Sequence, residues 1–119
     1  LLESRGLGDV YKRQPKTLVK KNDIHITSKR NFDCFQDTEL DMLLKRTLNV
    51  KNIIICGVNT DTCVYGTTFG ASNRGYNPIV IECCTGSMRG EDQHQTALKI
   101  MSQSIAWVMK KEEILNKLN

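Results

Sequence analysis

The sequence lacks any long hydrophobic run. Its longest unbroken apolar stretch, at residues 53–58 of a 119-residue chain, falls far short of the roughly 20 residues that a membrane-spanning helix needs. We therefore expect no membrane association. Apolar residues make up 39% and charged residues 25% of the chain, which argues against intrinsic disorder and fits a single globular domain.

Side-chain groupings typical of metal sites are also missing. The chain contains no CxxC pair, and its two histidines, His25 and His94, are far apart in the sequence. The sequence therefore predicts no metal and no cofactor.

Basic charge is concentrated near the start of the chain. Residues 12–30 hold seven basic side chains and one acidic side chain, a local charge of +6 in a chain whose net charge is +4. Aromatic residues are not interleaved with this basic stretch, and no nucleic-acid reading module is recognisable. We therefore expect no nucleic-acid partner.

Cysteine is present in an odd number, five, and Cys83 and Cys84 are adjacent. Both features disfavour a disulfide framework, so we expect reduced thiols and a cytoplasmic location. Cys34, Cys56 and Cys84 are predicted to be small buried hydrophobic residues.

Residues 1–14, LLESRGLGDVYKRQ, show neither helical nor strand periodicity. They resemble translated adapter read-through, so we expect a non-native leader there. Residues 15–119 would then be a partial domain whose true N-terminal segment is absent. A disordered natural N-terminus is the alternative.

From Pro15 onward the pattern is regular. It predicts strands over residues 24–27, 53–56, 79–81 and 107–109, helices over residues 39–48, 63–74 and 91–104, and a helical tail. A capping box of Thr38 and Asp41 should open the helix at 39–48. The run at 53–56 is typical of a strand covered on both faces. Alternating strands and helices imply parallel pairing, and hence an α/β fold.

The second predicted helix contains two glycines and ends at another. Gly66 and Gly70 weaken its helix propensity and indicate close packing, and Gly75 is a typical C-terminal cap.

The turn GVNTDTCV, residues 57–64, places Cys63 at the start of a helix directly after a strand. Unpaired N–H groups and the helix dipole should stabilise a thiolate there, lower its pKa and receive an oxyanion. Lys29, at the end of the first predicted strand, should lie at the same carboxyl edge of the sheet. From the pattern alone, inert packing of Cys63 and a solvated Lys29 remain open.

Three stretches carry a family resemblance: SKRNFDCFQDTELDMLL (28–44), NIIICGVNTDTCVYGTTFGASNRGY (52–76) and IVIECCTGSMRGEDQHQTALKIM (79–101). Together they resemble the isochorismatase-like cysteine hydrolase superfamily over about residues 20–112. The resemblance implies a three-layer α/β/α fold with a mostly parallel sheet, incomplete in this chain.

The resemblance also implies roles for individual residues. Cys63 would be the nucleophile and Lys29 the catalytic lysine. A cis peptide would join Val58 to Asn59, and the amides of Asn59 and Cys63 would form the oxyanion hole. Phe35 resembles an aromatic residue near the substrate pocket, with an ordinary core position as the alternative.

The implied reaction is hydrolysis of a C–N bond in a small amide through a thioester. The family's third catalytic group is an aspartate at the end of its first strand. None of Asp23, Asp33 and Asp61 follows such a strand, so the triad is predicted to be incomplete and this chain inactive or nearly so. The full-length parent is expected to form a homo-oligomer.

Several alternatives stay open. Residues 59–62, NTDT, resemble the carbamoyl-amide branch slightly more than nicotinamidases. A nicotinamidase-type or isochorismatase-type hydrolase is the runner-up. A catalytically silent module for small-molecule binding or oligomerisation is the non-enzymatic alternative. His94 is interpreted as a packing or capping residue, and Cys83 stands where many relatives have aspartate.

Overall fold

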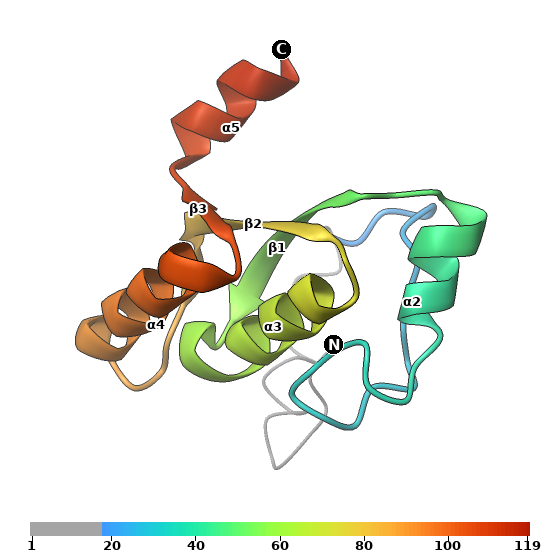
Figure 1. Ribbon diagram of the computed structural model, residues 1–119, viewed down its shortest axis with the longest axis horizontal. Helices are drawn as coiled ribbons and strands as arrows, with labels where there is room; N and C mark the ends of the chain where they lie inside the picture. The colour runs from blue at the N-terminus through green and yellow to red at the C-terminus, as the bar shows by residue number, and fades with distance from the viewer. Residues whose placement is uncertain (1–17) are drawn as a thin grey trace.

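A computed structural model describes residues 18–119 of the chain (Figure 1). The predicted leader at residues 1–14 lies outside the described residues. The elements are α2 (Leu40–Met42), the π-helical turn η2 (Leu43–Thr47), β1 (Asn52–Val58), a second π-helical turn η3 (Thr60–Val64), α3 (Tyr65–Asn73), β2 (Asn77–Gly86), α4 (Glu91–Ser104), β3 (Trp107–Met109) and α5 (Lys111–Leu118).

The strands form one parallel sheet in the order β1-β2-β3. Ile54 lies opposite Ile79, and Ile79 lies opposite Trp107. This arrangement confirms the predicted α/β class with a parallel sheet.

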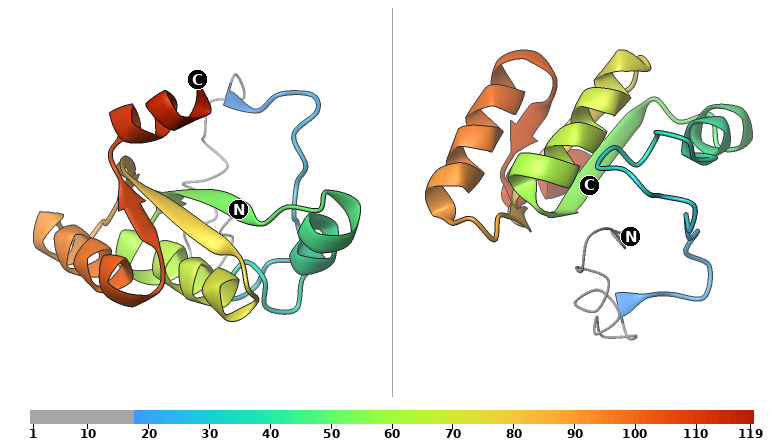
Figure 2. Two further views of the ribbon diagram at one scale, coloured as in Figure 1. Left: turned by 45° about the horizontal axis from the view of Figure 1, so that its top comes forward. Right: turned by 90° about the horizontal axis from the view of Figure 1, so that it is seen from below.

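Helices α3 and α4 lie side by side on one face of the sheet (Figure 2). The core lies between this face and the two helices, and is formed by Phe35, Ile55, Val64, Ala71, Tyr76, Val80, Ala97, Leu98 and Met101. α5 lies on the other side of the sheet (Figures 1 and 2).

The sheet's second face is largely open, which corrects one prediction. Ile54 is 47% exposed and Trp107 66% exposed, whereas Ile55 points into the core. The strand at 53–56 is therefore covered on one face only, because among the described residues α5 is the only helix on the other side of the sheet, and it is short.

The segment before α2 departs from prediction. Residues 24–27 form no strand. They do not pair with β1, which is the edge strand of the described sheet and pairs only with β2. The predicted capping box is also absent. The Thr38 hydroxyl donates to the Cys34 carbonyl at 2.6 Å, and Asp41 instead accepts a hydrogen bond from the Tyr76 hydroxyl at 2.8 Å.

Helix boundaries elsewhere follow the sequence closely. Gly75 has a φ of 84°, and its N–H donates to the Ser72 carbonyl at 3.1 Å, so it ends α3 as predicted. Within residues 18–119, no helix combines the length and the apolar character needed to cross a membrane.

Candidate active site

The site is built on the turn that links β1 to α3. The peptide bond between Val58 and Asn59 is cis, at the position that the family resemblance assigns to it. After it, the N–H of Val64 donates to the Asn59 carbonyl at 3.1 Å, which closes the π-helical turn η3. This turn holds Cys63 beside the carboxyl end of β1.

The Cys63 side chain is enclosed, with only 5% of the residue exposed. The Lys29 ammonium, the Thr62 side chain and the Asn59 backbone each act to lower the pKa of its thiol. Burial raises the pKa of the Cys63 thiol, and the positive charge of Lys29 only partly opposes this rise. The predicted lowering of the pKa is therefore wrong, because burial outweighs the polar neighbours.

Lys29 reaches the site from a segment without regular structure. The residue is 3% exposed, and its Nζ has no hydrogen-bond partner among the described residues. The Arg30 guanidinium donates to the Thr27 and Lys29 carbonyls at 3.0 and 2.9 Å, which fixes the backbone at this point. A buried ammonium normally has a partner, because removing it from water is costly.

The candidate carboxylates are all engaged elsewhere. Asp33 accepts a hydrogen bond from the Phe35 N–H at 2.8 Å and pairs with Arg74 at 3.5 Å. Asp61 accepts from the Ser87 hydroxyl at 2.8 Å. Asp23 accepts from a backbone N–H at 2.8 Å at the exposed start of the described chain. None of the three reaches the Lys29 ammonium.

Two contacts that the sequence did not suggest tie the turn to α4 and its preceding loop. The buried Thr60 hydroxyl and His94 Nδ1 lie 2.7 Å apart. Arg89 pairs with Asp61 at 3.0 Å. The partners are 34 and 28 residues apart, so no local pattern could have revealed them. Both contacts support the position of η3.

Phe35 has the alternative role, in the core. It is 3% exposed, its ring stacks on Tyr76 at 5.5 Å, and the Arg74 guanidinium lies 5.0 Å from its centroid. A cleft of about 510 Å³ lies elsewhere, between β2, α4 and α5, where Cys83 and His94 line it.

Three cysteine predictions also need correction. Cys34 is half-buried, and Cys56 and Cys84 are exposed. The latter two lie in strands with one largely open face, which explains their exposure. Within residues 18–119, no group of three or more His, Cys, Asp or Glu side chains is arranged to hold a metal ion.

Comparison with known proteins assigns the family. The model of the isochorismatase domain matches residues 10–113. The chain belongs to the isochorismatase family. Among curated members, an uncharacterized isochorismatase family protein, YecD, from Escherichia coli O157:H7 is 33% identical over 97 residues, which cover 82% of this chain and 50% of that protein.

Solved structures of the isochorismatase family share the fold. An isochorismatase-like hydrolase from Alkaliphilus metalliredigens has a TM-score of 0.79 at 25% identity, and the match covers 85% of this chain and 53% of that one. The nicotinamidase SaPncA from Staphylococcus aureus has a TM-score of 0.68 at 33% identity, covering 86% and 60% respectively. These isochorismatase-family relatives suggest a hydrolase, and the chain spans about half the length of the curated relatives it matches.

Proposed function

We propose that this chain carries the cysteine and lysine of a hydrolase site that cleaves a C–N bond in a small amide or carbamoyl compound. The observation that carries the proposal is the pairing of a buried thiol, Cys63, with a buried ammonium, Lys29, that has no partner among the described residues. An inert packing cysteine would not require a buried positive charge beside it.

The reaction would begin with the Cys63 thiolate. It attacks the substrate carbonyl carbon, and the carbonyl electrons move onto oxygen. The amides of Asn59 and Cys63 are assigned to this oxyanion. Collapse of the tetrahedral intermediate breaks the C–N bond, a protonated amine or ammonia leaves, and a thioester remains on Cys63. Water then attacks the thioester carbonyl carbon, the C–S bond breaks, and the carboxylic or carbamic acid leaves as the thiol is restored.

Proton transfer requires a third group. The thiol must lose a proton, and the leaving nitrogen must gain one. Lys29 would stabilise the thiolate and the developing negative charge, but an ammonium cannot act as the base. A carboxylate beside Lys29 would accept the thiol proton and also satisfy the buried ammonium. Because no described carboxylate occupies this place, we propose that the chain alone is inactive or nearly so.

Chemical rescue tests this assignment. We expect the chain to release little ammonia from a panel of nicotinamide, biuret and N-carbamoyl compounds, and added formate to increase the release by acting as the missing base. Mass spectrometry should detect a substrate-derived acyl adduct on Cys63. The panel also separates the nicotinamide and carbamoyl branches.

Two matched variants serve as controls. Cys63→Ser should abolish the formate-dependent release, whereas Cys84→Ser, which changes an exposed thiol, should preserve it. Release that persists in Cys63→Ser would overturn the nucleophile assignment. A version extended at its N-terminus with the authentic upstream sequence should turn over without formate. Equal turnover by the original chain would overturn the proposed inactivity.

The silent-module alternative predicts a different result. Such a protein would bind members of the panel or self-associate, yet form no acyl adduct with or without formate. The buried ammonium beside the thiol favours the hydrolase, because neither binding nor assembly requires that pair.

A further inference from the structure

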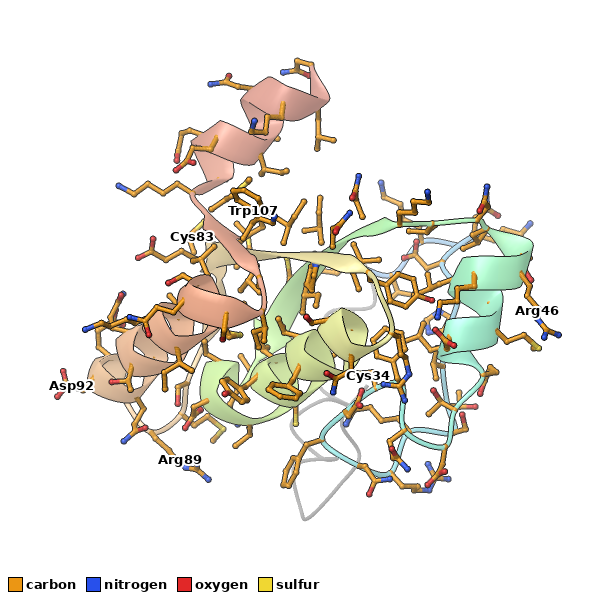
Figure 3. All side chains as sticks on the ribbon, in the orientation of Figure 1. Cys34, Arg46, Cys83, Arg89, Asp92 and Trp107 are labelled. Atoms are coloured by element: carbon orange, nitrogen blue, oxygen red, sulfur yellow. The ribbon has the colours of Figure 1, made fainter. Side chains whose placement is uncertain are left out.

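Three of the five thiols gather at one place, away from Cys63. Cys83 and Cys84 lie near the carboxyl end of β2, and their sulfur atoms are 3.9 Å apart. Gly57 on β1 lies opposite Thr85 on β2, so Cys56 and Cys84, each one residue earlier, lie on neighbouring strands, and each thiol affects the pKa of the other. All three residues are exposed. Figure 3 shows Cys83 well separated from Cys34, and Cys63, unlike the three clustered cysteines, is buried.

An irregularity in the sheet brings these residues together. Ile55 pairs with Val80, but Gly57 pairs with Thr85, so two steps along β1 correspond to five along β2. Four residues of β2, 81–84, therefore lie opposite the single residue Cys56 and form a bulge. The Thr85 hydroxyl donates to the Glu82 carbonyl at 3.1 Å within this bulge. Such bulges re-aim side chains that regular alternation would send to opposite faces.

The cluster offers two candidate pairs, and geometry separates them. Neighbouring strands are about 4.8 Å apart, within the Cα separation of about 4.4–6.8 Å that disulfides adopt. Cys56 and Cys84 lie on neighbouring strands, each one residue before the paired Gly57 and Thr85. Adjacent residues such as Cys83 and Cys84 can close only a small, strained ring. Cys83 instead lines the 510 Å³ cleft together with His94.

We propose that Cys56 and Cys84 form a site of reversible oxidation, in which a peroxide converts the two thiols to a disulfide that links β1 to β2. The link would lie directly before Gly57, where the turn toward Cys63 begins. It does not depend on the proposed hydrolase activity, because it uses neither Cys63 nor Lys29.

The chemistry balances with hydrogen peroxide as the oxidant. One thiol ionises, and its thiolate attacks a peroxide oxygen, which breaks the O–O bond and gives a sulfenic acid and, with the released proton, water. The second thiol attacks that sulfur, forms the S–S bond and releases a second water. Overall, two thiols and one peroxide give one disulfide and two waters.

Burial raises the pKa of Cys56, and also that of Cys84, where the nearby Lys111 ammonium partly opposes the rise. The reaction should therefore accelerate as the pH rises toward the thiol range, because the thiolate is the attacking species.

The test treats the protein with hydrogen peroxide and then blocks the remaining thiols with iodoacetamide. We expect a mass loss of two hydrogen atoms, reversal by dithiothreitol, and a tryptic peptide pair joined through Cys56 and Cys84. The oxidised protein should also melt at a higher temperature, because the link restricts the unfolded chain between the two strands.

Matched variants determine which thiols react. Cys83→Ser and Cys63→Ser should each retain the link, whereas Cys56→Ser should lose it together with the rise in melting temperature. A joined peptide through Cys83 and Cys84, or oxidation of Cys56 and Cys84 only to separate sulfinic acids, would overturn the proposal. So would a disulfide between two molecules in place of one within the chain.

Discussion

Lys29 and Cys63 depend on each other because both are buried and only one of them carries a fixed charge. The ammonium of Lys29 has no described hydrogen-bond partner, while its charge lowers the pKa of a thiol that burial raises. The same lysine therefore destabilises the fold and favours the reactive form of the nucleophile. A substitution there should move stability and reactivity in opposite directions.

We predict that Lys29→Met slows alkylation of Cys63 and stabilises the fold. Without the ammonium the thiol pKa rises further, so the labelling rate at a fixed pH falls by about tenfold for each unit of the rise. Loss of a buried ammonium that has no described hydrogen-bond partner should increase the free energy of unfolding. Iodoacetamide labelling followed by mass spectrometry gives the rate, and urea titration gives the stability.

Lys51→Met provides the matched control, because Lys51 is exposed. It should leave both quantities unchanged. If Lys29→Met labelled Cys63 at the original rate, the ammonium would not act on this thiol, and the proposed pairing would be wrong.

Sequence analysis predicted that Lys29 and Cys63 would lie at one edge of the sheet. It did not predict that both would be buried or that the pKa of Cys63 would be raised. The run before Cys63 correctly predicted the strand that leads to it, whereas the strand predicted to end at Lys29 does not form, so only the family resemblance related Lys29 to Cys63. The high thiol pKa could not be predicted, because it depends on how deeply the folded chain buries Cys63. The Thr60–His94 contact was missed for a similar reason, since it joins two distant elements.

Among the elements, α3 is held closely against the segment that follows Lys29. A Cβ at Gly70 would overlap the carboxylate of Asp33, and a Cβ at Gly66 would lie 3.4 Å from Phe32. Asp33 cannot move freely, because it bonds the Phe35 N–H and Arg74. The glycines therefore allow Phe32 and Asp33 to pack against this helix, as the sequence positions of the glycines indicated.

We predict that Gly70→Ala destabilises the protein by about 1–3 kcal/mol through this overlap, although alanine favours a helix by up to about 1 kcal/mol. Urea titration should show the loss. In an Asp33→Ala background the same change should become neutral or stabilising. Gly86→Ala, where a Cβ would have no neighbour within 4 Å, is the control. An equal loss in both backgrounds would contradict the packing argument.

The order of strands and helices followed from periodicity, whereas two irregular features did not. The π-helical turn η2 needs the Leu48 N–H to reach the Leu43 carbonyl, 3.0 Å away, and nothing in the leucine spacing distinguishes this bond from that of an α-helix. The bulge in β2 depends on its register against β1, which is a property of the pair. Local sequence therefore predicts which elements form, and pairing decides their irregularities.

At the scale of the whole described chain, residues 18–119, the main feature is that one face of the sheet is largely uncovered. Ile54, Val58 and Trp107 are exposed large hydrophobic residues on strands β1 and β3. The apolar run at residues 53–56 predicted a cover on both faces. An apolar run in one strand does not show whether another element of the chain packs against its second face. Exposed apolar sheet surface commonly leads to association.

We therefore predict that this chain self-associates through the open face. Multi-angle light scattering should give a mass above that of one chain, and the emission of Trp107, the only tryptophan, should shift to the blue as concentration rises. Ile54→Lys places a charge at the middle of β1's open side, so it should reduce the mass toward the monomer and abolish the shift. Leu48→Lys, at an equally exposed apolar residue outside the sheet, should change neither. A monomer at every concentration, or dissociation by both variants alike, would show that the open face does not mediate assembly.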